Sequence, residues 1–165
     1  MEATLRVLVA DDHCVNRILL RTMFESLGCS VETAENGAEA LSLSGPFDLV
    51  CLDRHMPVMG GEEVTARLSG EAFVVACTSH VGDIGGRFDM LIEKPVDCRA
   101  IVAAVAAART WRLSRNLRFL APVTVERERR RITAFATAHP DSAAQISQAV
   151  QSAAVAAFRF RGGRR

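Results

Sequence analysis

Leu49–Gly61, with the sequence LVCLDRHMPVMGG, combines an apolar run, an acid and a turn. The run stops abruptly on Asp53, and the Met-Pro and Gly-Gly pairs beyond it lead into a polar, helix-like segment. This pattern predicts a buried strand that presents one carboxylate at its C-terminal end, where open parallel sheets place their chemistry. Taken alone, Asp53 is explained more simply as a turn residue, because Asp favours turns. The residues at the ends of the other predicted strands decide between these two explanations.

Five short apolar runs predict strands, at residues 5–10, 30–33, 47–53, 73–78 and 90–93. Helices are predicted between them over 14–27, from 36 through 41 and over 60–68, and a longer helix follows from Asp97 to about Trp111. Strands that alternate with helices indicate an α/β fold, a doubly wound parallel sheet with helices on both faces. Ser79 to Phe88 carries three glycines, so a fourth helix there is predicted to be short, distorted or missing.

Local signals support these helices. Asn36, followed three residues later by Glu39, resembles an N-cap pair, and Gly28 is placed to end the first helix. The first helix is predicted to be amphipathic, because helical spacing relates its apolar residues Val15, Ile18, Leu19, Met23 and Leu27.

Polar residues follow four of the five predicted strands: Asp11 and Asp12, Asp53, Thr78 and Lys94. Parallel strands bring these positions to one edge of the sheet, which favours a functional role for Asp53 over a turn. Lys94 is the single lysine among 20 basic residues, although one lysine must fall somewhere by chance.

Carboxylates held together repel one another unless a cation lies among them, and an oxygen-only set suits Mg²⁺. Helix capping is the alternative for Asp11 and Asp12. With Mg²⁺ bound, Asp53 is predicted to act as a nucleophile toward a phosphoryl group, whose oxygens Lys94 and Thr78 would hold. For Thr78, the alternative is a β-favouring residue at a strand end.

Over residues 4–110, these features resemble the receiver domains of response regulators in two-component signalling. Some of the motifs are similar to receivers attached to hybrid sensor kinases. The matching segments are Asp11-Asp12, Asn16-Arg17, residues 27–31, residues 34–41, Asp53 within LDRHMPVMGG, Thr78-Ser79 and Lys94-Pro95.

The resemblance implies a five-stranded, flavodoxin-like sheet of order 2-1-3-4-5 and a cis Lys94-Pro95 bond. It implies Mg²⁺-dependent phosphorylation of Asp53 by a histidine kinase or a histidine phosphotransfer protein. The metal ligands would be Asp11, Asp12, Asp53 and the backbone carbonyl of His55. The chain would then be a phosphoacceptor regulatory domain and not an enzyme with an external substrate. A hydrolase is the weaker alternative, because the phosphatases we would compare need a second acid at the position of His55.

Three departures from the family concern how phosphorylation is read out. The segment between Thr78 and Lys94 is short, Gly60 replaces the usual acid, and Leu91 stands where an aromatic switch residue is usual. We therefore expect an intact site with a weaker or different output.

The charge distribution predicts two parts. Residues 1–108 hold 16 acidic and 8 basic residues, whereas residues 109–165 hold 3 and 12. We expect a receiver domain over 1–111 and a basic, helical C-terminal extension over 112–165. The extension has two predicted helices, Val125–Ala138 and from Asp141 to Phe158, which could dock on the receiver or form a homodimer. Its arginines offer the alternative of a DNA-binding transcriptional regulator, although charge runs are more often solvated faces.

Five cysteines without C-x-x-C spacing argue against a disulfide framework and a zinc site. The apolar runs are too short to span a membrane, and no leader-like segment opens the sequence. We therefore expect reduced cysteines and a cytoplasmic location.

Overall fold

The computed structural model describes residues 4–43, 45–68, 70–79, 88–116, 122–142, 144–148 and 150–151. The chain divides into two compact units, Met1–Cys98 and Arg99–Arg165, each of which is described by itself.

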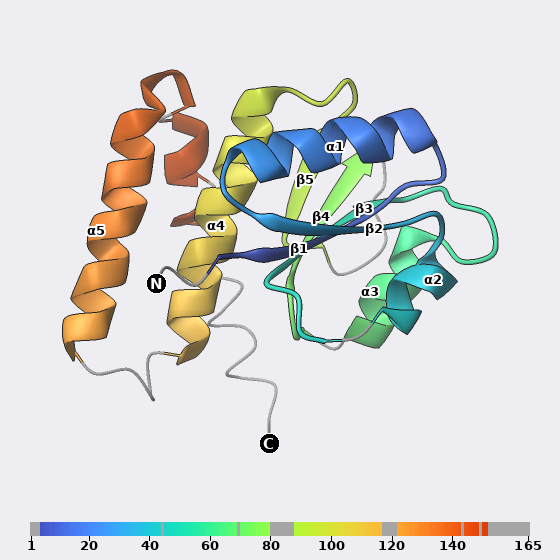
Figure 1. Ribbon diagram of the computed structural model, residues 1–165, viewed down its shortest axis with the longest axis horizontal. Helices are drawn as coiled ribbons and strands as arrows, with labels where there is room; N and C mark the ends of the chain where they lie inside the picture. The colour runs from blue at the N-terminus through green and yellow to red at the C-terminus, as the bar shows by residue number, and fades with distance from the viewer. Residues whose placement is uncertain are drawn as a thin grey trace. The chain divides into compact units, whose positions relative to one another are not determined.

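The first unit contains a five-stranded parallel sheet of order β2-β1-β3-β4-β5 (Figure 1). All five predicted strands are confirmed, as is the predicted strand order. Their bounds are β1 Arg6–Ala10, β2 Ser30–Ala34, β3 Leu49–Asp53, β4 Phe73–Thr78 and β5 Met90–Glu93. Every residue of β3 and β4 is buried, which explains why these strands are continuous apolar runs without alternation.

Helices cover both faces of the sheet. Helix α1 (Cys14–Ser26) lies on one face, while α2 (Gly37–Ser42) and α3 (Gly61–Leu68) lie together on the other (Figure 1). A cluster of buried side chains fills the space beneath α2 and α3; it includes Leu8, Val50, Leu52, Val64 and Val74. The doubly wound arrangement is therefore confirmed.

The orientation of α1 differs from the amphipathic prediction. Leu20 and Phe24 are the buried side chains of this helix. Of the predicted apolar set, Val15, Ile18 and Leu19 are 71%, 66% and 45% exposed. Met23 and Leu27 of the same set are half-buried. The helix carries apolar residues on two sides, so spacing alone selected a stripe of which only part packs against the protein.

Both predicted helix signals are confirmed. The side chain of Asn36 accepts a hydrogen bond from the Glu39 N–H at 2.9 Å. After α1, Gly28 has a φ of +78°, its N–H donates to the Glu25 carbonyl, and the Cys29 N–H donates to the Phe24 carbonyl. This is a Schellman C-cap, for which glycine is the preferred residue.

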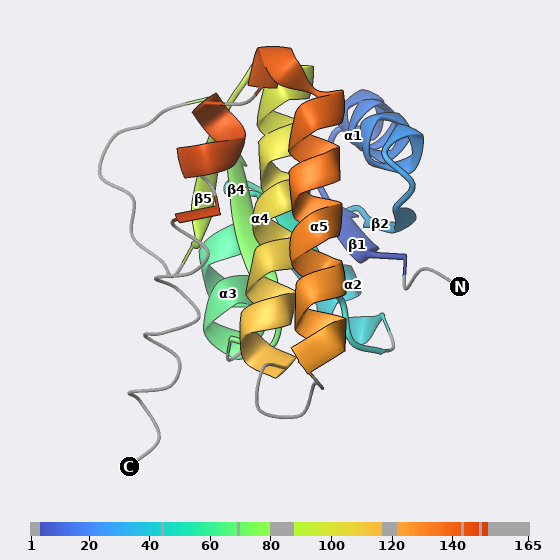
Figure 2. The same ribbon diagram turned by 90° about the vertical axis from the view of Figure 1, so that its left-hand side faces the viewer.

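The second unit contains α4 (Cys98–Asn116) except for its first residue, α5 (Pro122–Ala138) and the short 3₁₀ helix η1 (Pro140–Ser142). Helices α4 and α5 lie side by side, and the Arg109 guanidinium stacks 4.6 Å from the Phe135 ring centroid (Figure 2). Helix α4 continues five residues beyond the predicted end at Trp111, which was wrong. The proposed division between residues 111 and 112 stays a prediction.

Two predictions fall outside the described residues. The shortened fourth helix was expected within 79–88, of which 80–87 are not described. The last helix was expected to reach Phe158; residues 144–148 are helical, and the description ends at residue 151.

No helix within the described parts of the chain is long and apolar enough to cross a membrane. All five cysteines are free, with Cys29, Cys51 and Cys77 buried and Cys14 and Cys98 exposed. A hydrogen bond with the Cys77 thiol, together with burial, raises the pKa of Cys51 well above its usual value. A protonated, buried thiol is chemically inert, which suits a structural role for this pair.

Candidate functional site

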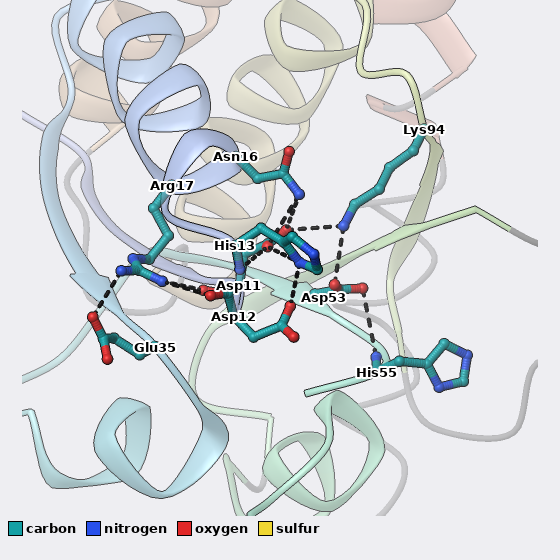
Figure 3. Close-up of polar contacts among 9 residues, drawn as sticks. All are labelled: Asp11, Asp12, His13, Asn16, Arg17, Glu35, Asp53, His55 and Lys94. Carbon is teal, nitrogen blue, oxygen red and sulfur yellow. Dashed lines mark hydrogen bonds and ion pairs between the residues drawn. The ribbon is translucent and has the colours of Figure 1, made fainter. Parts of the chain in front are cut away.

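Three of the predicted site residues meet at the carboxyl edge of the sheet (Figure 3). Asp11 follows β1, Asp53 ends β3, and Lys94 follows β5. The Lys94 Nζ lies 2.9 Å from Asp11 Oδ2 and 3.0 Å from Asp53 Oδ2, so one ammonium bridges the two carboxylates. The Lys94–Pro95 peptide bond that follows is cis, as the resemblance implied.

The bridge keeps Lys94 charged. Burial alone would lower the pKa of its amine, but the hydrogen bonds and charges of Asp11 and Asp53 outweigh burial and raise the pKa above the usual lysine value. Asp11 is fully buried and Asp53 is 9% exposed, so both carboxylates depend on such partners.

Asp12 lies beside Asp11 in a tighter group of possible metal ligands. The ligand atoms of Asp11, Asp12 and His13 all lie within 4.8 Å of one another. The His13 Nδ1 is 2.8 Å from Asp12 Oδ1 and its ring is exposed. Sequence reasoning missed His13, whose position directly after the acid pair was the available signal.

Asp11 is held by groups from the first turns of α1. Its Oδ1 accepts a hydrogen bond from the His13 N–H at 2.9 Å, and the Asn16 Nδ2 lies 3.1 Å from each carboxylate oxygen. Arg17 binds the backbone of the same turn and pairs with Glu35 (Figure 3). Asn16 and Arg17 entered the prediction only as part of the resemblance, without a role.

Thr78 and His55 are placed differently from the bridged trio. Thr78 is buried at the end of β4, where its carbonyl accepts a hydrogen bond from the Lys94 N–H at 2.8 Å. The His55 N–H lies 3.5 Å from Asp53 Oδ1, and its exposed ring points away from the carboxylates (Figure 3). The predicted roles of the Thr78 hydroxyl and the His55 carbonyl stay predictions.

The loop after Asp53 turns sharply and brings α3 against the end of β3. The Gly61 N–H donates to the Arg54 carbonyl at 3.1 Å, and a Cβ on Gly61 would lie 2.6 Å from the Asp53 carbonyl oxygen. Val58 has a φ of +68°, which is a strained value for a β-branched residue. The turn therefore needs glycine at Gly61 for close approach and tolerates strain at Val58.

Gly61→Ala is expected to lower the free energy of unfolding by about 1–3 kcal/mol, because the new methyl group must displace the Asp53 backbone. Urea denaturation of the full chain measures this change. Gly28→Ala is a comparison with a different cause: a Cβ there meets no atom within 4 Å, so its expected loss of about 1–2 kcal/mol reports the strain of the positive φ alone. A Gly61→Ala chain as stable as wild type would contradict the close approach.

The donor set fits a hard divalent cation. Asp11, Asp12 and Asp53 supply carboxylate oxygens, and the Lys94 ammonium leaves this group with net negative charge. Mg²⁺ prefers hard oxygen ligands such as carboxylates and retains waters, which the partly exposed side chain of Asp12 would allow. A carboxylate, a cation site and an ammonium at one sheet edge can together receive and hold a phosphoryl group.

Comparison of the chain with known proteins identifies its relatives. The sequence model of the response regulator receiver domain matches residues 7–106. A two-component response regulator of Oryza sativa subsp. japonica is 39% identical over 72 residues, which are 40% of this chain and 57% of that protein. The sensor histidine kinase GacS of Pseudomonas protegens is 42% identical over 62 residues, 36% of this chain and 7% of the kinase. The chain thus spans about half the length of the first relative and a small part of the second.

Solved structures show the same fold. The response regulator TrrA of Thermotoga maritima, in complex with Mg²⁺ and a beryllium fluoride, matches with a TM-score of 0.51 and 33% identity, over 55% of this chain and 87% of that one. A signal receiver domain from Pseudomonas fluorescens Pf-5 matches with a TM-score of 0.58 and 23% identity, over 64% and 94% of the two chains. None of these relatives favours the DNA-binding alternative.

Proposed function

Because the chain belongs to the response regulator receiver domain family, we propose that Asp53 accepts a phosphoryl group from a phosphohistidine donor in a two-component phosphorelay. The donor would be a histidine kinase or a histidine phosphotransfer protein. The chain then acts as a phosphoacceptor regulatory domain and not as an enzyme on an external substrate. The proposal includes a cytoplasmic location.

The observation that carries the proposal is the ammonium bridge between Asp11 and Asp53. The Lys94 ammonium joins Asp53, at the end of β3, to Asp11 of the acid pair. Its flexible side chain can move from these carboxylates to an oxygen of the incoming phosphoryl group. Asp53 is 9% exposed and only one of its oxygens, Oδ2, contacts Lys94. The contact of the other oxygen, Oδ1, with the His55 N–H is longer, at 3.5 Å. Oδ1 is therefore the oxygen that acts as the nucleophile.

In the reaction, Asp53 Oδ1 forms a bond to phosphorus while the phosphorus–nitrogen bond of the donor histidine breaks and its electron pair returns to the imidazole. Lys94 moves with the charge from the carboxylate to a phosphoryl oxygen. The Thr78 hydroxyl donates to another oxygen. These roles position the group and stabilise its charge, which is most of what phosphoryl transfer requires.

Asp11 and Asp12, with Asp53 and the carbonyl of His55, would hold Mg²⁺. When bound, the ion neutralises charge shared by the carboxylates and the phosphoryl oxygens. Asp11 is oriented for this role by His13 and Asn16, which bind its oxygens.

Incubation of the full chain with a small phosphodonor and Mg²⁺ tests the proposal. Intact-mass measurement should detect one added phosphoryl group that hydroxylamine removes and that is absent when EDTA replaces Mg²⁺. The absence of uptake with Mg²⁺ would contradict the proposed function.

The exposed side of α1 offers a docking surface for the donor. Val15, Ile18 and Leu19 form an apolar ridge at i, i+3 and i+4, and α1 begins directly after His13, beside the acid pair. An exposed apolar patch next to a reaction site suits contact with a helical partner.

Ile18→Glu is expected to slow transfer from a phosphorylated histidine phosphotransfer protein by about tenfold, the effect of losing roughly 1.4 kcal/mol of contact energy. Uptake from a small phosphodonor should be unchanged, since that reaction needs no docking. Ala66→Glu, at an exposed position of α3, is the matched control for added charge. Equal transfer rates for the wild type and the Ile18 variant, measured by radiolabel transfer, would rule out this face.

A further inference from the structure

Arg17 makes contacts that the proposed reaction does not use. Its Nη1 donates hydrogen bonds to the carbonyl oxygens of Asp11 and Asp12, at 2.9 and 3.1 Å, and its Nη2 donates to Glu35 Oε1 at 2.8 Å. The Arg17 side chain is 14% exposed, and Figure 3 shows it reaching from α1 across the acid turn toward Glu35.

The two carbonyls belong to the peptide groups on either side of Asp12. One nitrogen that binds both of them fixes the orientation of these two planes, and with them the direction in which the Asp12 side chain leaves the backbone. Asp11 has further anchors on its carboxylate, from His13 and Asn16. The carboxylate of Asp12 contacts the exposed ring of His13, so its position depends more on the backbone.

We propose that Arg17 is a positioning residue for Mg²⁺ binding. Arg17 holds the Asp11-Asp12 turn in the geometry that ligates the ion, while Glu35 cancels the charge of the Arg17 guanidinium. This inference rests on the proposed function, because it takes the two acids as the ligands of the ion.

The charge of Glu35 matters because a cation beside the acid pair would otherwise oppose the binding of Mg²⁺. The Arg17–Glu35 ion pair supplies hydrogen bonds to the turn without adding net positive charge near the ligands. A planar guanidinium can satisfy two carbonyls on one side and a carboxylate on the other, whereas the single nitrogen of a lysine cannot reach all three.

Arg6, the first residue of β1, provides a matched control at the opposite end of that strand from the acid turn. It too pairs with a glutamate of β2, from Nη2 to Glu32 Oε1 at 2.6 Å, and its Nη1 contacts the Pro46 carbonyl at 3.3 Å. Arg6→Lys therefore removes a comparable arginine fork between β1 and β2 that is remote from the acid turn.

The test measures Mg²⁺ binding to the unphosphorylated full chain by isothermal titration calorimetry and stability by urea denaturation in EDTA. Arg17→Lys should weaken Mg²⁺ binding by about tenfold, as outer-shell changes commonly do. Arg6→Lys should leave the Kd for Mg²⁺ unchanged even where it costs similar stability. Glu35→Gln, which keeps Arg17 but leaves its charge uncancelled, should weaken binding by about threefold.

An unchanged Kd in both Arg17→Lys and Glu35→Gln would overturn the inference while leaving the proposed function intact. Equal weakening by Arg17→Lys and Arg6→Lys would also overturn it, since the effect would then be general loss of stability. Failure of the wild-type chain to bind Mg²⁺ at all would overturn the proposed function, and this inference with it.

Discussion

Asp53→Asn should abolish phosphoryl uptake, with the rate reduced by at least about a thousandfold to background. The amide has the shape of the carboxylate and its oxygen can still accept a hydrogen bond from Lys94, but it cannot attack phosphorus. The chain should therefore stay folded, with a free energy of unfolding in EDTA within about 1 kcal/mol of wild type. Intact-mass analysis after incubation with a small phosphodonor and Mg²⁺ measures the uptake.

Asp48→Asn is the matched control for this experiment. Asp48 directly precedes β3 at its opposite end and accepts a hydrogen bond from the Arg6 N–H at 3.0 Å, far from the acid edge. Its variant should take up phosphoryl at the wild-type rate. Residual uptake in Asp53→Asn would indicate a second acceptor.

Lys94→Met should reduce the rate of phosphorylation by about a hundredfold, because the developing charge on the phosphoryl oxygens loses its ammonium partner. In EDTA the variant should also be less stable by about 1–3 kcal/mol at neutral pH, since two carboxylates lose a charged hydrogen-bond donor.

The pH dependence of this loss has a definite sign. The pKa of Lys94 is raised in the folded chain, so the charged amine favours folding. Its contribution is complete below the usual lysine value of about 10.4 and disappears as the pH rises through the higher folded value. The stability difference between wild type and Lys94→Met should therefore be constant near neutral pH and shrink in alkaline solution.

Lys94→Arg separates charge from geometry. A guanidinium keeps the ion pair and most of the stability. Because it is bulkier and planar, it should follow the phosphoryl oxygen during transfer less well than the lysine ammonium, so only part of the phosphorylation rate should return. Quenched assays of phosphoryl uptake from a small phosphodonor compare the wild type, Lys94→Met and Lys94→Arg. Wild-type rates in Lys94→Met would show that the bridge has no part in the chemistry.

The sequence predicted the sheet well because the buried strands are continuous apolar runs that end on polar residues. Asp11, Asp53 and Lys94 could be brought together from topology alone, since parallel strands present their carboxyl ends at one edge. The strand order and the cis Lys94-Pro95 bond were predicted from the resemblance, and the structure confirms both.

Other features depended on information that spacing does not contain. Helix α1 has apolar residues on two sides, and only the packing shows that Leu20 and Phe24 face inward while Ile18 faces outward. The contacts of Arg17 depend on where two carbonyls point, which residue types do not reveal. The positive φ of Val58 contradicts the preference of valine; Val58 is the central residue of a γ-turn in which the Met59 N–H donates to the Pro57 carbonyl at 2.7 Å.

The most direct test of the central claim is the location of the phosphoryl group after transfer from a phosphohistidine donor with Mg²⁺. Reductive trapping of the acyl phosphate, followed by peptide mapping, identifies the modified carboxylate in the full chain. We predict a single modified residue, Asp53. Modification of a different residue, such as Asp12 or Asp48, or no modification in the presence of a competent donor, would contradict this account.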